Sequence, residues 1–269
     1  MDNYVKMIHC KICGSPSNKI FTAPVLDKYP VDYHQCNVCK FIQPDDPFWL
    51  NEAYSSAITS LDIGLVTRNQ ELKNVVHNVV YFLFDKKGKF IDYGGGYGLL
   101  VRMLRDRNLD FYRQDKYCEN LFAKHFDEID AGTNSFELLT SFEVFEHLED
   151  PITELEKMFS YAPSVLFSTV LQPESTVITP TSWWYVMPEI GQHISLFSKP
   201  SLKKLAEKYN KRIYSNKSIH LITDKKVNKF IFWICTKPII SGFINFFIPK
   251  KSLLMKDFNY LKGKLYNNQ

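Results

Sequence analysis

The chain has 269 residues, 45% of them hydrophobic and 23% charged, a balance typical of a globular protein with a full core. Its formal charge is only +4 and no dense Lys/Arg stripe occurs, which argues against a nucleic-acid partner. The start, MDNYVKMIHC, lacks the apolar core of a secretory signal, so we expect a cytoplasmic protein whose six cysteines are reduced.

Residues 1–44 read as a separate module that binds a metal. Its predicted ligands are four cysteines in two C-x-x-C pairs: Cys10, Cys13, Cys36 and Cys39. Each pair aims two thiolates at one point, and together they complete a tetrahedron around a soft cation. Because four thiolates leave no open position, the pattern predicts a structural Zn²⁺ site on which the module depends for folding. His9 and His34 lie next to the pairs and are alternative ligands.

The next two segments predict an α/β fold. Residues 45–84 read as a helical lead-in, because apolar residues recur at three- and four-residue spacing in RNQELKNVVHNVVYFLF. Within residues 85–225, apolar runs (FIDY, LDFYRQD, FELLTS, SVLFSTV) alternate with helical stretches such as CENLFAKHF and PITELEKMFSYA. This alternation predicts a mainly parallel sheet with helices on both faces. A late helix, KPSLKKLAEKYN, would be capped by Ser201 or by the preceding proline.

The stretch FIDYGGGYGLL, residues 90–100, places four glycines directly after the first apolar run. A glycine-rich turn between a parallel strand and its helix brings backbone N–H groups close to a ligand. The pattern differs from the dinucleotide pattern G-x-G-x-x-G and fits a ligand with an amino acid end and no pyrophosphate. Asp92 would orient the loop or accept hydrogen bonds near an ammonium group. Asp115, at the end of the second run, would accept both ribose hydroxyls.

Through DYGGGYG, Asp115 and FELLTSFEVFEHLEDP, the sequence resembles the class I S-adenosylmethionine-dependent methyltransferases over about residues 60–222. The resemblance implies a Rossmann-like fold with a mainly parallel seven-stranded sheet. It also implies S-adenosylmethionine as cofactor and S-adenosylhomocysteine as its product. The implied cofactor-binding residues are Arg68, Asp92, Tyr93, Gly94, Gly95, Gly96, Gly98, Asp115, Lys116, Phe142, Glu143 and His147.

Several of these residues have implied roles. Phe142 and Glu143 would line the pocket where the fourth strand ends. Arg68 would pair with the cofactor carboxylate, the alternative being a surface arginine on a helix. Glu146 and His147 form a tempting catalytic pair, but their position in the family favours a structural role at the start of a helix.

A long loop, LQPESTVITPTSWWYVMPEIGQHISLFS, follows the SVLFSTV run, and long loops inside compact domains are commonly binding loops. Methyl transfer to a hydroxyl needs a general base. His193 is the first candidate, because a neutral imidazole takes up a proton near pH 7, and Glu189 or Tyr185 is the second. The loop also carries an aromatic cluster, formed by Trp183, Trp184 and Tyr185. This cluster predicts either stacking on a sugar ring or nucleoside base, or a hydrophobic plug over the core.

These features predict O-methylation of a small polar acceptor, such as a sugar or nucleotide-linked sugar in surface polysaccharide or secondary-metabolite biosynthesis. The cysteine module resembles that of a subfamily in which a cysteine zinc module precedes this fold, and which often acts on nucleotide-linked sugars or other small metabolites. An RNA methyltransferase with a zinc finger is an alternative, against which the small positive charge speaks. A non-catalytic cofactor-binding module is another, against which the intact glycines and Asp115 speak.

Residues 226–269 read as a hydrophobic and basic extension. Its aromatic run, KFIFWICTKPIISGFINFFIPKK, approaches the length of a membrane span, but a Lys-Pro pair interrupts its centre. A packed or dimer-forming element is the first interpretation. Peripheral contact of residues 230–251 with the inner face of an anionic bilayer, helped by Lys250 and Lys251, is the second.

Overall fold

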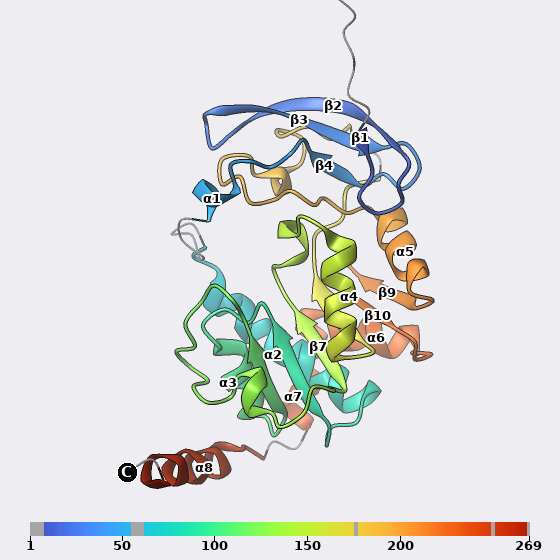
Figure 1. The fold of residues 1–269 in the computed structure, drawn as a ribbon. Coiled ribbons are helices and arrows are strands. Elements are labelled where there is room, and N and C mark those ends of the chain that lie inside the picture. The colour runs from blue at the N-terminus through green and yellow to red at the C-terminus, as the bar shows by residue number, and fades with distance from the viewer. Residues whose placement is uncertain (1–7, 55–61, 175–176, 249–250, 268–269) are drawn as a thin grey trace, which may run out of the picture.

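The N-terminal part of the chain forms a small antiparallel sheet with the strand order β1-β2-β3-β4. This computed structural model describes residues 8–54, 62–174, 177–248 and 251–267. The strands of the small sheet are β1 Ile8–His9, β2 Pro16–Val25, β3 Tyr29–Cys36 and β4 Ile42–Pro44. Figure 1 shows this sheet lying over one end of a larger α/β domain.

The larger sheet has six strands among the described residues, in the order β6-β5-β7-β8-β10-β9. They are β5 Lys89–Tyr93, β6 Asp110–Gln114, β7 Leu138–Ser141, β8 Val165–Ser168, β9 Arg212–Asn216 and β10 Ile219–Thr223. The first four strands in this order are parallel, whereas β10 runs antiparallel to both of its neighbours. The predicted α/β fold is therefore confirmed, as a mixed sheet.

The structure differs from the predicted seven strands at the β6 edge of this sheet. Beyond β6, the described chain makes only one isolated parallel bridge, between Arg113 and Asp127. A strand needs several extended residues in register, but here the short helix η1, Glu128–Asp130, begins at once. The Asp127 amide donates to the side chain of Asp130 at 3.2 Å, which favours the helical turn over a longer strand.

Helices lie on both faces of the larger sheet. The α-helices of the described residues are α1 Leu50–Ala53, α2 Leu65–Leu83, α3 Leu99–Arg105, α4 Pro151–Tyr161, α5 Lys199–Lys208, α6 Lys229–Thr236, α7 Pro238–Phe247 and α8 Leu254–Asn267. Two more short helices are η2 Phe145–His147 and η3 Trp184–Val186. α2 packs against α3, α6 and α7, and Figure 1 shows α4 on the opposite side of the sheet from α2.

One predicted helix is wrong, because CENLFAKHF (118–126) is irregular. The side chain of Asn120 accepts from the Ala123 amide at 2.9 Å and donates to the Ala123 carbonyl at 2.7 Å. The guanidinium of Arg113 also binds the carbonyl of Cys118. These side-chain bonds take up backbone groups that a helix would pair internally.

The predicted cap of α5 is also wrong, because its N-cap is Ser198. The Ser198 hydroxyl accepts from the Ser201 amide at 3.0 Å, and the Ser201 hydroxyl accepts from the Ser198 amide at 2.9 Å. This reciprocal pair is a capping box with Pro200 in the first turn. The Ser198 hydroxyl also donates to the Cys39 carbonyl at 2.6 Å, which ties α5 to the cysteine module.

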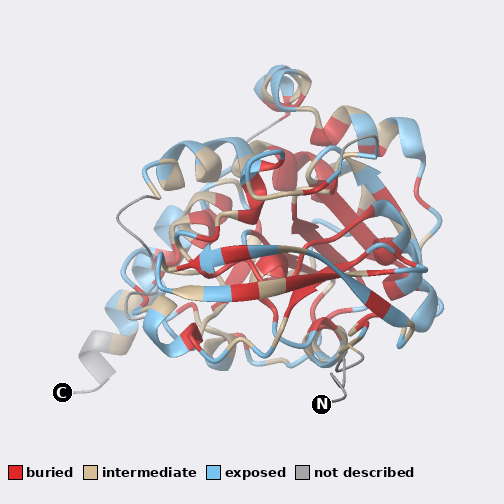
Figure 2. Ribbon diagram, turned by 90° about the horizontal axis from the view of Figure 1, so that it is seen from above, coloured by how far each residue is buried: buried red, intermediate tan, exposed pale blue. Residues whose placement is uncertain are grey.

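The cysteine module shares a core with the rest of the protein. A second buried cluster joins its Val25, Tyr33 and Ile42 to Trp183 and Ile194 of the loop between β8 and α5. Figure 2, seen from above, shows buried residues concentrated in the strands beneath the small sheet. The small sheet therefore packs onto the loop that carries His193, the first candidate for the catalytic base.

The hydrophobic extension folds as two short helices and not as one span. Among the described residues, no single helix combines the length and the apolar character needed to cross a membrane. α6 and α7 meet that test only as a pair, and they bend by 92° at the break between them.

Candidate functional site

The glycine loop, residues 94–98, connects the end of β5 to α3. Gly94, Gly96 and Gly98 have φ angles of 70°, 54° and 83°, in a region that favours glycine. Packing also requires two of them. A Cβ on Gly94 would lie 2.6 Å from Cγ2 of Val144, and one on Gly98 would lie 2.7 Å from a side-chain oxygen. Contacts within the protein are therefore sufficient to require these two glycines.

Gly96 is different, because a Cβ added to it would meet no atom within 4 Å. Its amide donates to Oδ2 of Asp115 at 2.8 Å, just beyond the end of β6. The other oxygen, Oδ1, accepts from the amides of Tyr117 and Cys118, each at 2.8 Å. The bare backbone at Gly96 therefore borders open space beside a carboxylate.

Arg113 fixes this arrangement and was missed from the sequence. Its Nε donates to the Gly96 carbonyl at 2.7 Å, and its Nη1 donates to Asp127 at 2.7 Å. The signal was its place two residues before Asp115, since alternate residues of an extended chain point to the same face. Arg113 therefore holds the glycine loop beside the segment that follows β6.

Asp92 lies beneath the glycine loop. It is 3% exposed, and Thr140 donates to its Oδ1 at 2.5 Å. A Cβ on Gly95 would lie 3.0 Å from its Oδ2, so Gly95 leaves room for this carboxyl group. Burial raises the pKa of Asp92 to about 7, and the charge of Asp115 acts in the same direction. Asp92 thus supports the loop from below.

The end of β7 brings Phe142 and Glu143 to the same end of the sheet. Phe142 is buried, while Glu143 is exposed at a φ of 56°. The Glu143 amide donates to Oγ of Ser168, and that hydroxyl donates back to Oε1 of Glu143, both at 2.8 Å. On α2, Arg68 lies 3.6 Å from Oε2 of Glu143 and 2.8 Å from the carboxylate of Asp62.

Two residues of the predicted cofactor set have other contacts. The hydroxyl of Tyr93 donates to Glu154 of α4 at 2.5 Å, so its side chain packs toward that helix. Lys116 is exposed, with its Nζ 5.6 Å from the ring centre of Tyr117. A third residue, His147, belongs to a separate cluster.

Glu146, His147 and His193 form an acceptor cluster in which Glu146 and His193 are buried and His147 is half-buried. η2 carries the first two, and the long loop between β8 and α5 (residues 169–198) carries His193. One ligand atom of each residue lies within 4.8 Å of the other two. The Glu146 carbonyl accepts the two amides that follow His193, each at 2.9 Å, so the backbone holds the two segments together.

Both histidines are fixed in one tautomer. Nδ1 of His193 lies 2.6 Å from the carbonyl of Tyr185, and Nδ1 of His147 lies 3.0 Å from the carbonyl of Gln192. A carbonyl only accepts, so each Nδ1 carries the hydrogen and each Nε2 keeps a lone pair. Oε2 of Glu146 has no hydrogen-bond partner among the described residues. The cluster therefore combines three acceptors, and it can take up a proton.

Burial sets the protonation of this cluster. The pKa of Glu146, which is 1% exposed, rises to about 7, mainly because burial disfavours the carboxylate and also because Glu143 is near. Burial and the neighbouring His147 lower the pKa of His193, and burial lowers that of His147. Both histidines are therefore neutral near pH 7, and Glu146 titrates there.

The long loop separates its aromatic residues into two groups. Trp183 and Tyr185 are buried in the second cluster, which favours the plug interpretation for these two. Trp184 is 68% exposed and is available for stacking. Glu189 is exposed and lies outside the acceptor cluster, whereas the ring of Tyr185 lies 4.6 Å from that of His193.

The four cysteines of the N-terminal module converge. Their Sγ atoms lie 3.5 Å apart for Cys10 and Cys39, 3.5 Å for Cys13 and Cys36, and 3.6 Å for Cys13 and Cys39. A tetrahedral Zn²⁺ with bonds of about 2.3 Å would separate sulfurs by about 3.8 Å, so the geometry fits that ion. Amides also donate to two of the thiols.

Neither alternative ligand points to this site. His9 bonds the carbonyl of Gly14 at 3.0 Å, and Nε2 of His34 lies 3.0 Å from the carboxylate of Asp45. The four thiols alone form the group of candidate ligands among the described residues of the module.

Comparisons with known proteins give one family. The methyltransferase domain family matches residues 67–216, more than half of the chain. No curated protein matches.

Three similar solved structures have low identity. The mitomycin 7-O-methyltransferase is 16% identical with a TM-score of 0.38, covering 56% of this chain and 52% of its own. A methyltransferase of calicheamicin biosynthesis, with S-adenosylhomocysteine bound, is 15% identical with a TM-score of 0.41. The match covers 67% of this chain and 69% of that protein. The plantazolicin methyltransferase, in complex with a monoazolic desmethyl analogue and S-adenosylhomocysteine, is 13% identical with a TM-score of 0.48. The match covers 66% of this chain and 93% of that protein. The chain thus spans about half the length of the mitomycin enzyme.

Proposed function

This chain belongs to the methyltransferase domain family, and we propose that it is an S-adenosylmethionine-dependent enzyme that methylates a hydroxyl of a small polar acceptor. The observation that carries the proposal is the open face of Gly96 beside the carboxylate of Asp115. When bound, the cofactor supplies a methyl group on a positively charged sulfur.

The glycine loop would hold the cofactor. The backbone of Gly96 would face the methionine part, and Asp115 would accept from the ribose. A carboxylate has about four acceptor positions, and three of those of Asp115 already bind amides. Asp115 therefore has room for one ribose hydroxyl, and not for the two that were expected from the sequence. Arg68, which has donors beyond those used by Asp62, would pair with the cofactor carboxylate.

His193 would remove the acceptor proton. Its Nε2 carries a lone pair, and its Nδ1–H is held by the Tyr185 carbonyl, so the ring is oriented before the acceptor binds. As the acceptor oxygen took the methyl group and the methyl–sulfur bond broke, the acceptor proton would pass to this Nε2. Glu146 would stabilise the resulting imidazolium, because its unpaired carboxyl oxygen lies in the same cluster.

The cysteine module would hold a structural Zn²⁺. The four thiolates would fix the loops that flank β1 and β3, and this sheet packs on the loop that carries His193. Zinc thiolates and six unpaired cysteines suit a reducing compartment, so the cytoplasm is the location we propose.

The acceptor class we propose is a sugar or nucleotide-linked sugar of surface polysaccharide or secondary-metabolite biosynthesis. Trp184 supports this class, because it is exposed and indole rings stack on sugar faces. Its ring lies 5.4 Å from that of Tyr185, which lies 4.6 Å from the ring of His193. The competing RNA methyltransferase would need a basic channel, for which a formal charge of +4 gives little support.

Transfer of a labelled methyl group tests this function. We expect the purified protein to label a member of a panel of sugars and nucleotide-linked sugars. His193→Gln should lower kcat by about a hundredfold without weakening S-adenosylhomocysteine binding. Glu189→Gln, at an exposed site on the same loop, tests the second candidate for the base and should keep wild-type activity. Label transfer to RNA, or cofactor binding without transfer to any acceptor, would contradict the proposal.

A further inference from the structure

Helix α7 turns its polar side chains inward. Ser241 and Asn245 are both buried against α2. Nδ2 of Asn78 donates to the carbonyl and to the hydroxyl of Ser241, both at 2.9 Å. Nδ2 of Asn245 in turn donates to Oδ1 of Asn78 at 3.0 Å. The polar face of α7 is therefore fully engaged with the protein.

The apolar face of the same helix points outward. Its large apolar side chains are mostly exposed: Ile239, Phe243, Phe246 and Phe247. Rings of neighbouring phenylalanines lie 5.1 and 5.3 Å apart and form one exposed cluster. On a helix at the surface of a water-soluble protein, the apolar stripe normally faces the core. α7 has the opposite orientation, as expected of a surface that contacts an apolar phase.

α6 extends this surface around the bend. Phe230 and Trp233 are exposed and stack with ring centres 6.0 Å apart. Nζ of Lys237, at the junction with α7, lies 4.7 Å from the ring centre of Trp233. We call the two helices with these exposed side chains the α6–α7 elbow.

The chain segment that contains the elbow carries charge of one sign, although one of its lysines, Lys225, pairs with Glu137. Between Asp224 and Asp257 the sequence contains no acidic residue and seven lysines: Lys225, Lys226, Lys229, Lys237, Lys250, Lys251 and Lys256. Of these, Lys250 lies outside the described residues. Exposed aromatic residues flanked by lysines are typical of helices that lie in the headgroup region of an anionic bilayer.

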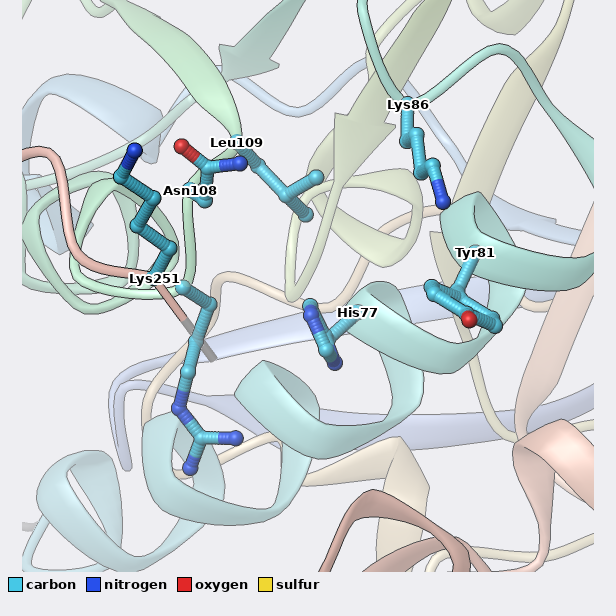
Figure 3. A pocket seen from close by; sticks show the side chains of 7 residues that line it. His77, Tyr81, Lys86, Asn108, Leu109 and Lys251 are labelled. Carbon is cyan, nitrogen blue, oxygen red and sulfur yellow. The ribbon is translucent and has the colours of Figure 1, made fainter. Parts of the chain in front are cut away.

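A cavity of about 220 Å³ is lined by residues of α2, of the turn after α3 and by Lys251. Two of its lining residues, His77 and Arg107, bond the side chain of Asn245 in α7. Three of its seven lining residues are cationic, Lys86, Arg107 and Lys251, and none is acidic. Figure 3 shows Lys86 and Lys251 on two sides of it, with His77 of α2 between them. Arg107 donates to the side chain of Asn245, so the cavity is connected to the inner face of α7. Its cations suit the phosphate of a lipid headgroup.

We propose that the α6–α7 elbow docks on an anionic lipid bilayer, with a headgroup phosphate in the adjoining cationic cavity. This goes beyond the proposed methyl transfer and does not depend on it. A second copy of the chain is the other candidate occupant, but it would bring two acid-free lysine segments together. Figure 1 shows α7 at the end of the molecule remote from the small sheet, so docking leaves that sheet clear of the membrane.

Cosedimentation of the full chain with vesicles tests the proposal. We expect binding to vesicles of equal parts phosphatidylcholine and phosphatidylglycerol, and at least tenfold weaker binding to pure phosphatidylcholine. Added salt should weaken the binding. Replacing Lys229 by Ala should reduce it about fivefold, the effect of one lysine near such a surface.

Matched variants separate this surface from general stickiness. Ile239→Ser and Phe246→Ser should each weaken vesicle binding about tenfold or more. Ile129→Ser is the control, because Ile129 is 86% exposed and Ile239 is 85% exposed, but Ile129 lies on η1. All three variants should keep the wild-type affinity for S-adenosylhomocysteine. Equal binding to both vesicle types, no binding, or a dimer in solution that Phe246→Ser dissociates would overturn the proposal.

Discussion

If the acceptor cluster works as we propose, Glu146→Gln should be less active than the wild type and, above pH 7, more stable. The substitution keeps the size of the side chain but removes its ionisation. The lost carboxylate would otherwise stabilise the protonated His193, so we expect kcat to fall roughly tenfold. The free energy of unfolding should instead rise, because the buried Glu146 carboxyl group is costly to ionise in the folded protein.

The magnitude comes from the pKa of Glu146, which is 4.5 for an unperturbed glutamate and about 7 in the folded protein. Between these two values the folded state binds the proton more strongly than the unfolded state, so the free energy of unfolding falls as pH rises. The difference of about 2.5 units corresponds to about 3 kcal/mol, fully developed above pH 7 and absent below pH 4.5. Glu146→Gln does not carry this penalty.

Chemical denaturation of both proteins at pH 5 and pH 8 measures the effect. The stability of Glu146→Gln relative to wild type should increase by about 2 to 3 kcal/mol between these pH values. Asp92, which also titrates near pH 7, is present in both proteins and cancels. Glu189→Gln, at an exposed site, should show no such increase. A relative stability of Glu146→Gln that is the same at both pH values would refute the reasoning.

Three other predictions follow from single sites. Gly94→Ala, at a φ of 70° and with its Cβ 2.6 Å from Val144, should lower the free energy of unfolding by roughly 2 kcal/mol or more, and an unchanged denaturation midpoint would contradict this. Cys36→Ser should remove about one equivalent of zinc and lower the thermal transition, while equal metal content by elemental analysis would count against the site. Trp184→Ala should raise the KM for the acceptor with little change in kcat, and an unchanged KM would remove its stacking role.

The glycine loop could be predicted from sequence because its signal is local. A glycine cluster directly after an apolar run is typical of a strand-to-helix turn that approaches a ligand, and Asp115 ends the next run. What the sequence could not separate is the reason for each glycine. Gly94 and Gly98 make room for protein atoms, and only Gly96 borders open space. That distinction depends on contacts with segments more than twenty residues away.

The acceptor cluster could be predicted only in part. His193 was chosen for its type and for the loop that carries it, but its relation to Glu146 depends on how residues 145–147 meet the long loop. Glu146 and His193 lie 47 positions apart in the chain, and no periodicity of the sequence connects them. The burial that changes the pKa of Glu146 is likewise a property of the assembled fold.

Local side-chain hydrogen bonds account for the errors in secondary structure. Asn120 bonds the backbone of Ala123 where a helix was predicted, and Ser198 starts α5 where Ser201 was expected. Polar residues of this kind compete with the helical backbone, and the apolar spacing alone does not reveal which arrangement wins. The small antiparallel sheet around the cysteines was not predicted either, because the cysteine spacing fixes ligands and not strands.

Calorimetric titration with S-adenosylhomocysteine tests the central claim most directly, using Gly96→Ala and Gly132→Ala as a matched pair. Both glycines have positive φ and no atom within 4 Å of an added Cβ, so the two variants should lose similar stability. Wild type and Gly132→Ala should bind about one equivalent, and Gly96→Ala should bind at least tenfold more weakly, because its methyl group would occupy the space of the ligand. Equal binding by both variants, or no binding by the folded wild type, would contradict the account.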